Sequence, residues 1–326
     1  MHERKVDRVF SYIGKRLLAL LPTVAVPMLL LFFMLRISSG DPAAVLAGED
    51  ASAEEVNAIR EELGLNDPLL VQFFSWLGRM VTLNFGDSLF LGQPVSTLVI
   101  DAFIVTSQLA ICALIIAIII GPLLGTFAAS TKFRALDSGL VVGSALGVAM
   151  PTFWLAIIGI FIFGVTLNVL PVSGYVAPSE DLGQFFFYMA LPAITLGVLE
   201  AATFFRYSRN AVLDAKHQPF VQTARAQGLG EGTIVTKYVF RAAMAPVVTV
   251  VGLSAASLLG GAVVTEEIFS IPGLGDTLLT AVGRRDYPLI EGSIFLIAIV
   301  FVLINLLVDI ICAIIDPRIR YQKAKG

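Results

Sequence analysis

Six long apolar stretches are the feature that most limits how this chain can fold. They are separated by polar segments and cover residues 17–37, 98–129, 140–167, 185–205, 244–264 and 289–315. A helix needs about 20 mainly apolar residues to cross a membrane, because the hydrocarbon core is about 30 Å thick. Each stretch reaches that length. The sequence therefore predicts an all-α membrane protein with six transmembrane helices.

The composition excludes a water-soluble fold. Hydrophobic residues make up 57% of the chain and charged residues 14%, whereas about 25% of the residues in a soluble domain are charged. The chain has 2 cysteines and 2 histidines, too few for a disulfide framework or a histidine-based metal centre. Its net charge of −3 gives no general affinity for nucleic acid. We therefore expect lipid around the spans, no nucleic-acid partner, no metal site and no catalytic residues.

Lysine and arginine predict the direction of the spans. They gather in the leader, in the loops after the second and fourth spans, and in the tail. Loops rich in these residues face the cytoplasm, so both termini are predicted to be cytoplasmic. The predicted regions are a leader with the first transmembrane helix (1–37), an extracytoplasmic region (38–97), a transmembrane core (98–315) and a cytoplasmic tail (316–326).

The external region between the first and second spans carries its own helical signals. Ser52 with Glu55 three residues later forms a capping box, which predicts the start of a helix. Beyond Pro68, the apolar run that begins at Leu69 and includes Trp76 is typical of a helix at the membrane interface. These short helices form either a lid on the ends of the spans or a docking surface for an external partner, and the pattern leaves both open.

Few polar side chains interrupt the spans. Glu200 lies in the fourth span, where it is either buried with a hydrogen-bond partner, which is the commoner case, or lines a polar translocation path. Asn305 and Asp309 are four residues apart on the sixth span and so share one face of the helix. Their pattern favours structural hydrogen bonds between helices.

Glycine and proline predict how the spans pack. Gly139, Gly143 and Gly147 recur at every fourth residue of the third span, which permits close approach of another helix. Pro151 and Pro192 are predicted to kink their helices.

The loops hold no motif of nucleotide or enzyme chemistry. The chain has no G-x-x-x-x-G-K-[ST] phosphate loop, so it does not bind ATP by that route. An ion-coupled secondary transporter, the alternative function, would need paired repeats and several ionisable groups in the membrane, and only Glu200 lies deep enough. A membrane-embedded enzyme would need a cluster of nucleophile, base or metal ligands, and the sequence shows none.

The cytoplasmic segment 206–241 is the most informative part of the chain. Residues 221–227 are good helix formers with small side chains, and Gly228 then ends the helix as a glycine cap. A second helical stretch, 234–240, leads into the fifth span. A short rigid helix between two membrane helices can enter a groove on another protein and transmit force. Judged by spacing alone, an interfacial amphipathic loop is an equally good interpretation.

Several motifs, found in order along nearly the whole chain, resemble one family. The run Gln222-Thr223-Ala224 with Gly228 resembles the E-A-A-x-x-x-G loop of permease subunits from binding-protein-dependent ABC importers. More narrowly, TARAQGL at 223–229 is similar to the T-A-R-A-K-G-L version in the dipeptide, oligopeptide and nickel permeases. Further matches are GDP at 40–42, LPAITLG at 191–197, EIFSIPGLG at 267–275 and DPRIR at 316–320. The chain departs from the family pattern with Gln222 for Glu, Gln227 for Lys and Arg241 for Pro.

The resemblance implies a type I ABC importer permease fold. The chain would cross a bacterial-type inner membrane several times. Such a subunit forms half of a translocation pathway with a second permease subunit, usually a distinct chain. Two ATPase subunits would bind below it, and an extracytoplasmic solute-binding protein would dock above. ATP and Mg²⁺ would bind to the ATPase subunits, with no cofactor on this chain. The branch handles di- and oligopeptides, nickel chelates, glutathione and some glycosides.

The resemblance also implies a set of residues that couple the permease to the ATPase subunits. They are Val221, Gln222, Thr223, Ala224, Arg225, Ala226, Gln227, Gly228 and Leu229. When the ATPase pair closes on ATP, this helix would move with the ATPase groove that holds it. The translocation pathway would then open to the extracytoplasmic side.

Overall fold

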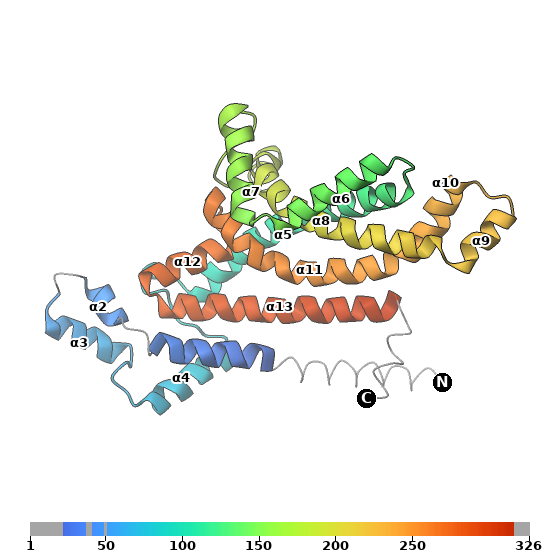
Figure 1. Ribbon diagram of the computed structural model, residues 1–326. Coiled ribbons are helices and arrows are strands. Elements are labelled where there is room, and N and C mark those ends of the chain that lie inside the picture. The colour runs from blue at the N-terminus through green and yellow to red at the C-terminus, as the bar shows by residue number, and fades with distance from the viewer. Residues whose placement is uncertain (1–21, 37–40, 49–50, 316–326) are drawn as a thin grey trace, which may run out of the picture. The chain divides into compact units, whose positions relative to one another are not determined.

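The computed structural model describes residues 22–36, 41–48 and 51–315, and its regular structure there is helical (Figure 1). In these residues the only extended pairing is an isolated bridge between Asp87 and Pro94. The chain forms two compact units, Met1–Val105 with Pro272–Leu303 and Thr106–Ile271 with Ile304–Gly326. The predicted leader and tail lie outside the described residues.

The first unit contains the external helices and parts of the spans. Its elements are the helix Pro22–Arg36, α2 (Pro42–Ala47), α3 (Ala53–Glu62), α4 (Leu69–Thr82), the start of α5 (Val95–Ser130), α12 (Leu274–Arg284) and the start of α13 (Tyr287–Ile315). The predicted capping box is confirmed at the start of α3. The Ser52 N–H donates to a Glu55 carboxylate oxygen at 2.8 Å, and the Glu55 N–H donates to the Ser52 hydroxyl at 3.3 Å.

A buried network holds the helix Pro22–Arg36 to α4 and α13. The Arg36 Nε donates to the side-chain oxygen of Gln72 at 3.0 Å, and the Arg36 Nη1 lies 3.7 Å from a Glu291 carboxylate oxygen. The guanidinium carbon lies 3.6 Å from the centre of the Phe32 ring, where an aromatic face attracts a cation. These contacts fix the C-terminal end of this helix within its unit.

The second unit contains most of the predicted transmembrane core. Its elements are the rest of α5, α6 (Arg134–Ala149), α7 (Thr152–Gly159), η1 (Ile160–Thr166), α8 (Leu182–Lys216), α9 (Pro219–Ala226), α10 (Glu231–Thr233), η2 (Ile234–Val239), α11 (Phe240–Phe269) and the end of α13. In Figure 1, α8 and α11 run alongside each other and lead to α9 and α10 at one end.

The number of spans reaches the expected six when bent helices are counted as single spans, but the set differs. The first predicted span appears among the described residues only as the shorter helix Pro22–Arg36, and two of the bent pairs lie within residues 231–284. Among the described residues, α5, α8 and α13 are each long and apolar enough to cross a membrane, and three bent pairs raise the number to six. The predicted third span is bent by 108° between α6 and α7, and Pro151 lies at this break as predicted. By contrast, α8 continues through Pro192 as one helix.

Within the described part of this chain, only one of the three glycines of the third span lies against another helix. A Cβ atom placed on Gly139 or Gly143 would meet no described atom within 4 Å. Only Gly147 lies against another helix, because its Cβ would fall 3.0 Å from the Ala202 Cβ. Spacing identified the glycines, but it carried no information about which of them face a neighbour within this chain.

Gly121 and Gly125 of α5 make a close contact with the backbone of α8. A Cβ on Gly121 would lie 2.6 Å from the Phe204 Cβ, and one on Gly125 would lie 2.6 Å from the Phe205 carbonyl oxygen. Two glycines four residues apart let two helix backbones approach closely. The backbones of α5 and α8 therefore meet where any larger residue would force them apart.

Candidate functional site

The end of α8 is fastened to α5 before the chain turns into α9. Lys216, the last residue of α8, donates from Nζ to the Ala129 carbonyl oxygen at 2.7 Å. Ala129 lies in the last turn of α5, where carbonyl groups lack partners within the helix and attract a cation. Pro219 then starts α9 at its first position, where a missing N–H costs nothing.

One face of α9 is packed into its own chain. Val221 and Ala224 are buried in a cluster with Val212 of α8, Val239 of η2 and Ala243 of α11. Residues three apart on a helix share a face, so this face anchors α9 to the two long helices on either side of it. The two buried side chains are therefore not available to a partner.

The opposite face of α9 and the turn after it are exposed. Its members are Gln222, Thr223, Arg225, Ala226, Gln227 and Gly228. Leu229 is half-buried and packs against the cluster under α9. Seven of the nine predicted coupling residues thus remain at or near the surface.

The predicted glycine cap is confirmed at Gly228. Its φ angle is +78°, a left-handed conformation that glycine adopts without strain. The Gly228 N–H donates to the Arg225 carbonyl at 2.9 Å, and the Leu229 N–H donates to the Ala224 carbonyl at 3.2 Å. This pair of bonds is a Schellman motif, which ends the helix sharply.

An ion pair closes the turn between α9 and α10. The Arg225 Nε donates to one carboxylate oxygen of Glu231 at 2.5 Å and its Nη2 to the other at 3.2 Å. Hydrogen bonding to Glu231 raises the pKa of the Arg225 guanidinium. Arg225 and Glu231 are six residues apart with a glycine turn between them, so helical spacing does not predict this pair. The remaining exposed residues of α9 carry no charge.

A second candidate region is a polar face on α8. Glu200, Thr203, Tyr207 and Asn210 follow one another at intervals of three or four residues, which places them on one face of the helix. The Glu200 carboxylate lies 3.4 Å from the Ser257 hydroxyl of α11.

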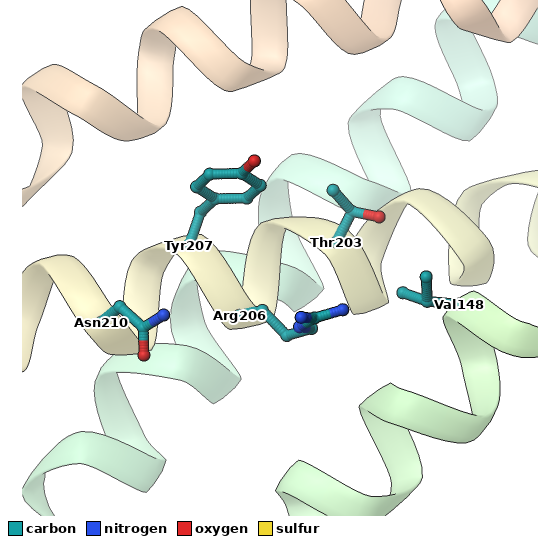
Figure 2. A pocket seen from close by; sticks show the side chains of 5 residues that line it. All are labelled: Val148, Thr203, Arg206, Tyr207 and Asn210. Atoms are coloured by element: carbon teal, nitrogen blue, oxygen red, sulfur yellow. The ribbon is translucent and has the colours of Figure 1, made fainter.

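A cavity of about 390 Å³ lies beside this face. Its lining residues are Val148, Thr203, Arg206, Tyr207 and Asn210. Figure 2 shows four of these side chains on one stretch of α8, with Val148 on α6 beside them. The sequence predicts a cytoplasmic segment that starts at Arg206, and α8 continues for ten residues beyond this residue to Lys216. The sequence signal that could have predicted this region is the spacing of Thr203, Tyr207 and Asn210, which recur every three or four residues.

An ion pair positions α6 against α8 close to the cavity. The Arg209 Nε and Nη2 donate to the two Asp137 carboxylate oxygens, both at 2.7 Å. Such bidentate ion pairs fix the orientation of the two side chains as well as the distance between them.

The structure describes the two other polar residues predicted in the spans, Asn305 and Asp309, only in part. Asn305 is half-buried on α13, and the side chain of Asp309 lies outside the described residues, so their pairing stays a prediction.

Models of two protein families match this chain. One, described as the binding-protein-dependent transport system inner membrane component, matches residues 121–321. The other, the N-terminal part of the membrane component of such systems, matches residues 9–110. This chain belongs to the family of binding-protein-dependent transport permeases. The permease is thus an inner-membrane component of an ABC importer, which excludes the ion-coupled secondary transporter.

Relatives of this permease match it along almost its whole length. It is 37% identical over 310 residues to a protein of Sinorhizobium fredii named as a peptide ABC transporter permease, covering 95% of this chain and 99% of that one. It is also 37% identical over 314 residues to the glutathione transport system permease protein GsiC of Salmonella typhi, covering 96% of this chain and 100% of GsiC.

Solved structures of the MetNI methionine ABC transporter in inward-facing conformations share the fold of the permease. One crystal form gives a TM-score of 0.54 at 16% identity, covering 67% of this chain and 96% of that one. A second form gives a TM-score of 0.53, with 68% and 97% covered. The expected type I importer permease fold is confirmed.

Proposed function

We propose that this permease forms half of the translocation pathway of an ATP-driven importer of peptides or related small solutes, and that it receives force through the exposed face of α9. The observation that carries the proposal is the two-sided nature of α9. One side is locked into the permease by Val221 and Ala224, and the other exposes side chains whose single charge, on Arg225, is paired with Glu231. The names of the peptide and glutathione relatives support the solute class.

The proposed assembly contains the partners expected from the sequence. A second permease subunit, a distinct chain, completes the pathway, and two ATPase subunits bind ATP and Mg²⁺ on the cytoplasmic side. A solute-binding protein delivers the solute to the extracytoplasmic region. Membership of a binding-protein-dependent ABC importer family supports each of these partners.

The proposed mechanism follows the packing around α9. When the ATPase subunits close on ATP, α9 moves with them. The buried cluster that joins α9 to Val212 and Val239 passes this motion into α8 and α11, because packed interiors transmit displacement rather than absorb it. ATP hydrolysis reverses the motion, which makes a two-state switch.

The polar face of α8 is the proposed lining of the pathway. Polar side chains on a membrane helix are costly against lipid, so they face a water-filled path or another protein. Glu200 and the polar residues beside the cavity lie on this face. The proposed second permease subunit would cover the open side of the cavity.

Cysteine cross-linking in the assembled transporter tests the coupling proposal. Gln222→Cys and Ala226→Cys should each form cross-links to an ATPase subunit, because both side chains are exposed on the proposed contact face. Ala135→Cys, on an exposed residue in the first turn of α6, is the matched control and should form none. Free reactivity of both α9 cysteines toward a water-soluble maleimide in the assembled transporter would contradict the proposal.

A bulky residue in the cavity tests the pathway proposal. Thr203→Trp should lower solute uptake at least about tenfold, equivalent to about 1.4 kcal/mol in an activation barrier, because it fills a path that the solute must use. Ile194→Trp is the control, since Ile194 is exposed half a turn away around α8. Uptake into proteoliposomes is the measurement. Equal uptake by both variants would show that the solute does not pass this face.

A further inference from the structure

The external helix α4 has two apolar faces instead of one. The first face packs inward, where Trp76 and Met80 are buried in one cluster with Met28 and Phe32 of the helix Pro22–Arg36. Phe73 packs against the same cluster. This contact alone would account for an ordinary amphipathic helix with water on its other side.

The second apolar face is exposed. It consists of Leu70, Phe74, Leu77 and Val81, whose side chains are between 39% and 76% exposed. These residues are three or four apart, so they form one stripe along the helix. We call this set the outer stripe. It contains no charged or polar side chain.

A polar edge completes the circumference of α4. Ser75, Arg79 and Thr82 are exposed, and the Arg79 Nη1 donates to the Ser75 hydroxyl at 3.2 Å. Their helical positions lie on the side away from the outer stripe. Water therefore has a polar edge to contact, and the outer stripe needs a different neighbour.

The depth of α4 indicates what that neighbour is. Met80 shares its cluster with Met28, which precedes Arg36 by eight residues, or about 12 Å along a helix. The helix Pro22–Arg36 is itself apolar, and its exposed side chains include Leu30 and Met34. The C-terminal half of α4 thus lies alongside the first membrane helix and not beyond its end.

We propose that α4 is a lateral membrane helix whose outer stripe contacts the acyl chains of the extracytoplasmic leaflet. Its polar edge then lies at the level of the lipid headgroups. The outer stripe continues the lipid-facing surface of the first helix, and an apolar face with an adjoining polar edge is the pattern of helices that lie in the membrane interface. The inference rests on membership of the membrane family, not on the proposed coupling through α9.

A docking surface for a soluble binding protein would have a different composition. Surfaces that bind and release a partner are about as polar as the rest of a protein surface. The outer stripe is wholly apolar over three turns of helix, so lipid is the better match.

Spin labelling of the full-length permease tests the proposal. In a background with Cys112→Ala and Cys312→Ala, single cysteines replace Leu70, Phe74 and Val81 on the outer stripe and Ser75, Arg79 and Thr82 on the polar edge. The proteins are reconstituted into nanodiscs of phosphatidylcholine and phosphatidylglycerol. We expect labels on the outer stripe to collide more with oxygen, which concentrates in acyl chains, than with a water-soluble nickel chelate. Labels on the polar edge should show the opposite preference.

Two results would overturn the proposal. One is equal access of the nickel chelate to both sets of positions, which would place the outer stripe in water. The other is labelling of the outer stripe by a membrane-impermeant maleimide that is lost when the solute-binding protein is added, which would make it a docking surface. Because single cysteines at six exposed positions disturb the packing little, a failure to fold at one of them leaves the comparison intact at the others.

Discussion

Glutamate in place of Ala226 should abolish ATP-driven uptake while leaving the permease folded. Ala226 is exposed on α9 and beside the Schellman turn, so a larger residue meets nothing within this chain that must move. In the proposed contact, however, a carboxylate would be buried against the ATPase subunit without a partner. Such a group destabilises a contact by about 3 kcal/mol or more, which is over a hundredfold in affinity.

Ala135→Glu is the matched control, because it makes the same chemical change at an exposed alanine in the first turn of α6. A carboxylate is well tolerated at a helix N-terminus. Uptake by proteoliposomes and solute-stimulated ATP hydrolysis should both be lost in Ala226→Glu and kept in Ala135→Glu. Normal ATP hydrolysis and uptake in Ala226→Glu would exclude α9 as the coupling element.

Ala226 is a cleaner test position than Gly228. Gly228 has open space around it, but its φ angle of +78° disfavours any residue with a Cβ. A Gly228→Asp variant would therefore lose activity either through the contact or through a distorted turn. Gly228→Asn separates these causes, since asparagine tolerates the left-handed conformation better than most residues.

Valine in place of Gly125 should prevent the permease from reaching a stable fold. The added Cβ would lie 2.6 Å from the Phe205 carbonyl oxygen and 2.9 Å from the Ser208 Cβ. Both belong to the body of α8, so α5 and α8 must separate. Overpacking of this kind costs about 1–3 kcal/mol or more, a large share of the 5–15 kcal/mol that stabilises a typical protein.

Gly143→Val provides the comparison, because Gly143 is also a glycine within an apolar helix but has no described atom within 4 Å of its Cβ position. Valine is a better helix former than glycine, so this variant should unfold at the same temperature as the parent or slightly higher. The measurements are the yield of monodisperse protein in detergent and its thermal unfolding. A Gly125→Val protein with parental stability would show that α5 and α8 do not meet there.

The sequence predicted the elements whose signals are local. Spans depend on the length of apolar runs, the start of α3 depends on Ser52 and Glu55, and the end of α9 depends on Gly228. Each of these signals involves residues within one or two turns of each other. The family motifs added the fold, because they occur in order along nearly the whole chain.

The sequence could not predict which side of an element faces which neighbour. Gly139 and Gly143 have the same spacing as Gly121 and Gly125, yet only the latter pair meets a second helix within this chain. In α9, Val221 and Ala224 turn inward while Gln222 and Ala226 turn outward. The side of a helix that faces a neighbour depends on packing between segments far apart in the chain. A single stretch of sequence therefore does not predict it.

The Schellman turn at Gly228 and the ion pair between Arg225 and Glu231 have a consequence for how the transporter is built. Both lie within this one polypeptide, so the proposed contact region of α9 has its shape before any other subunit binds. Binding then sacrifices little backbone freedom, which is the advantage of a preorganised surface. We therefore expect the permease and the ATPase subunits to separate and bind again without either of them having to refold.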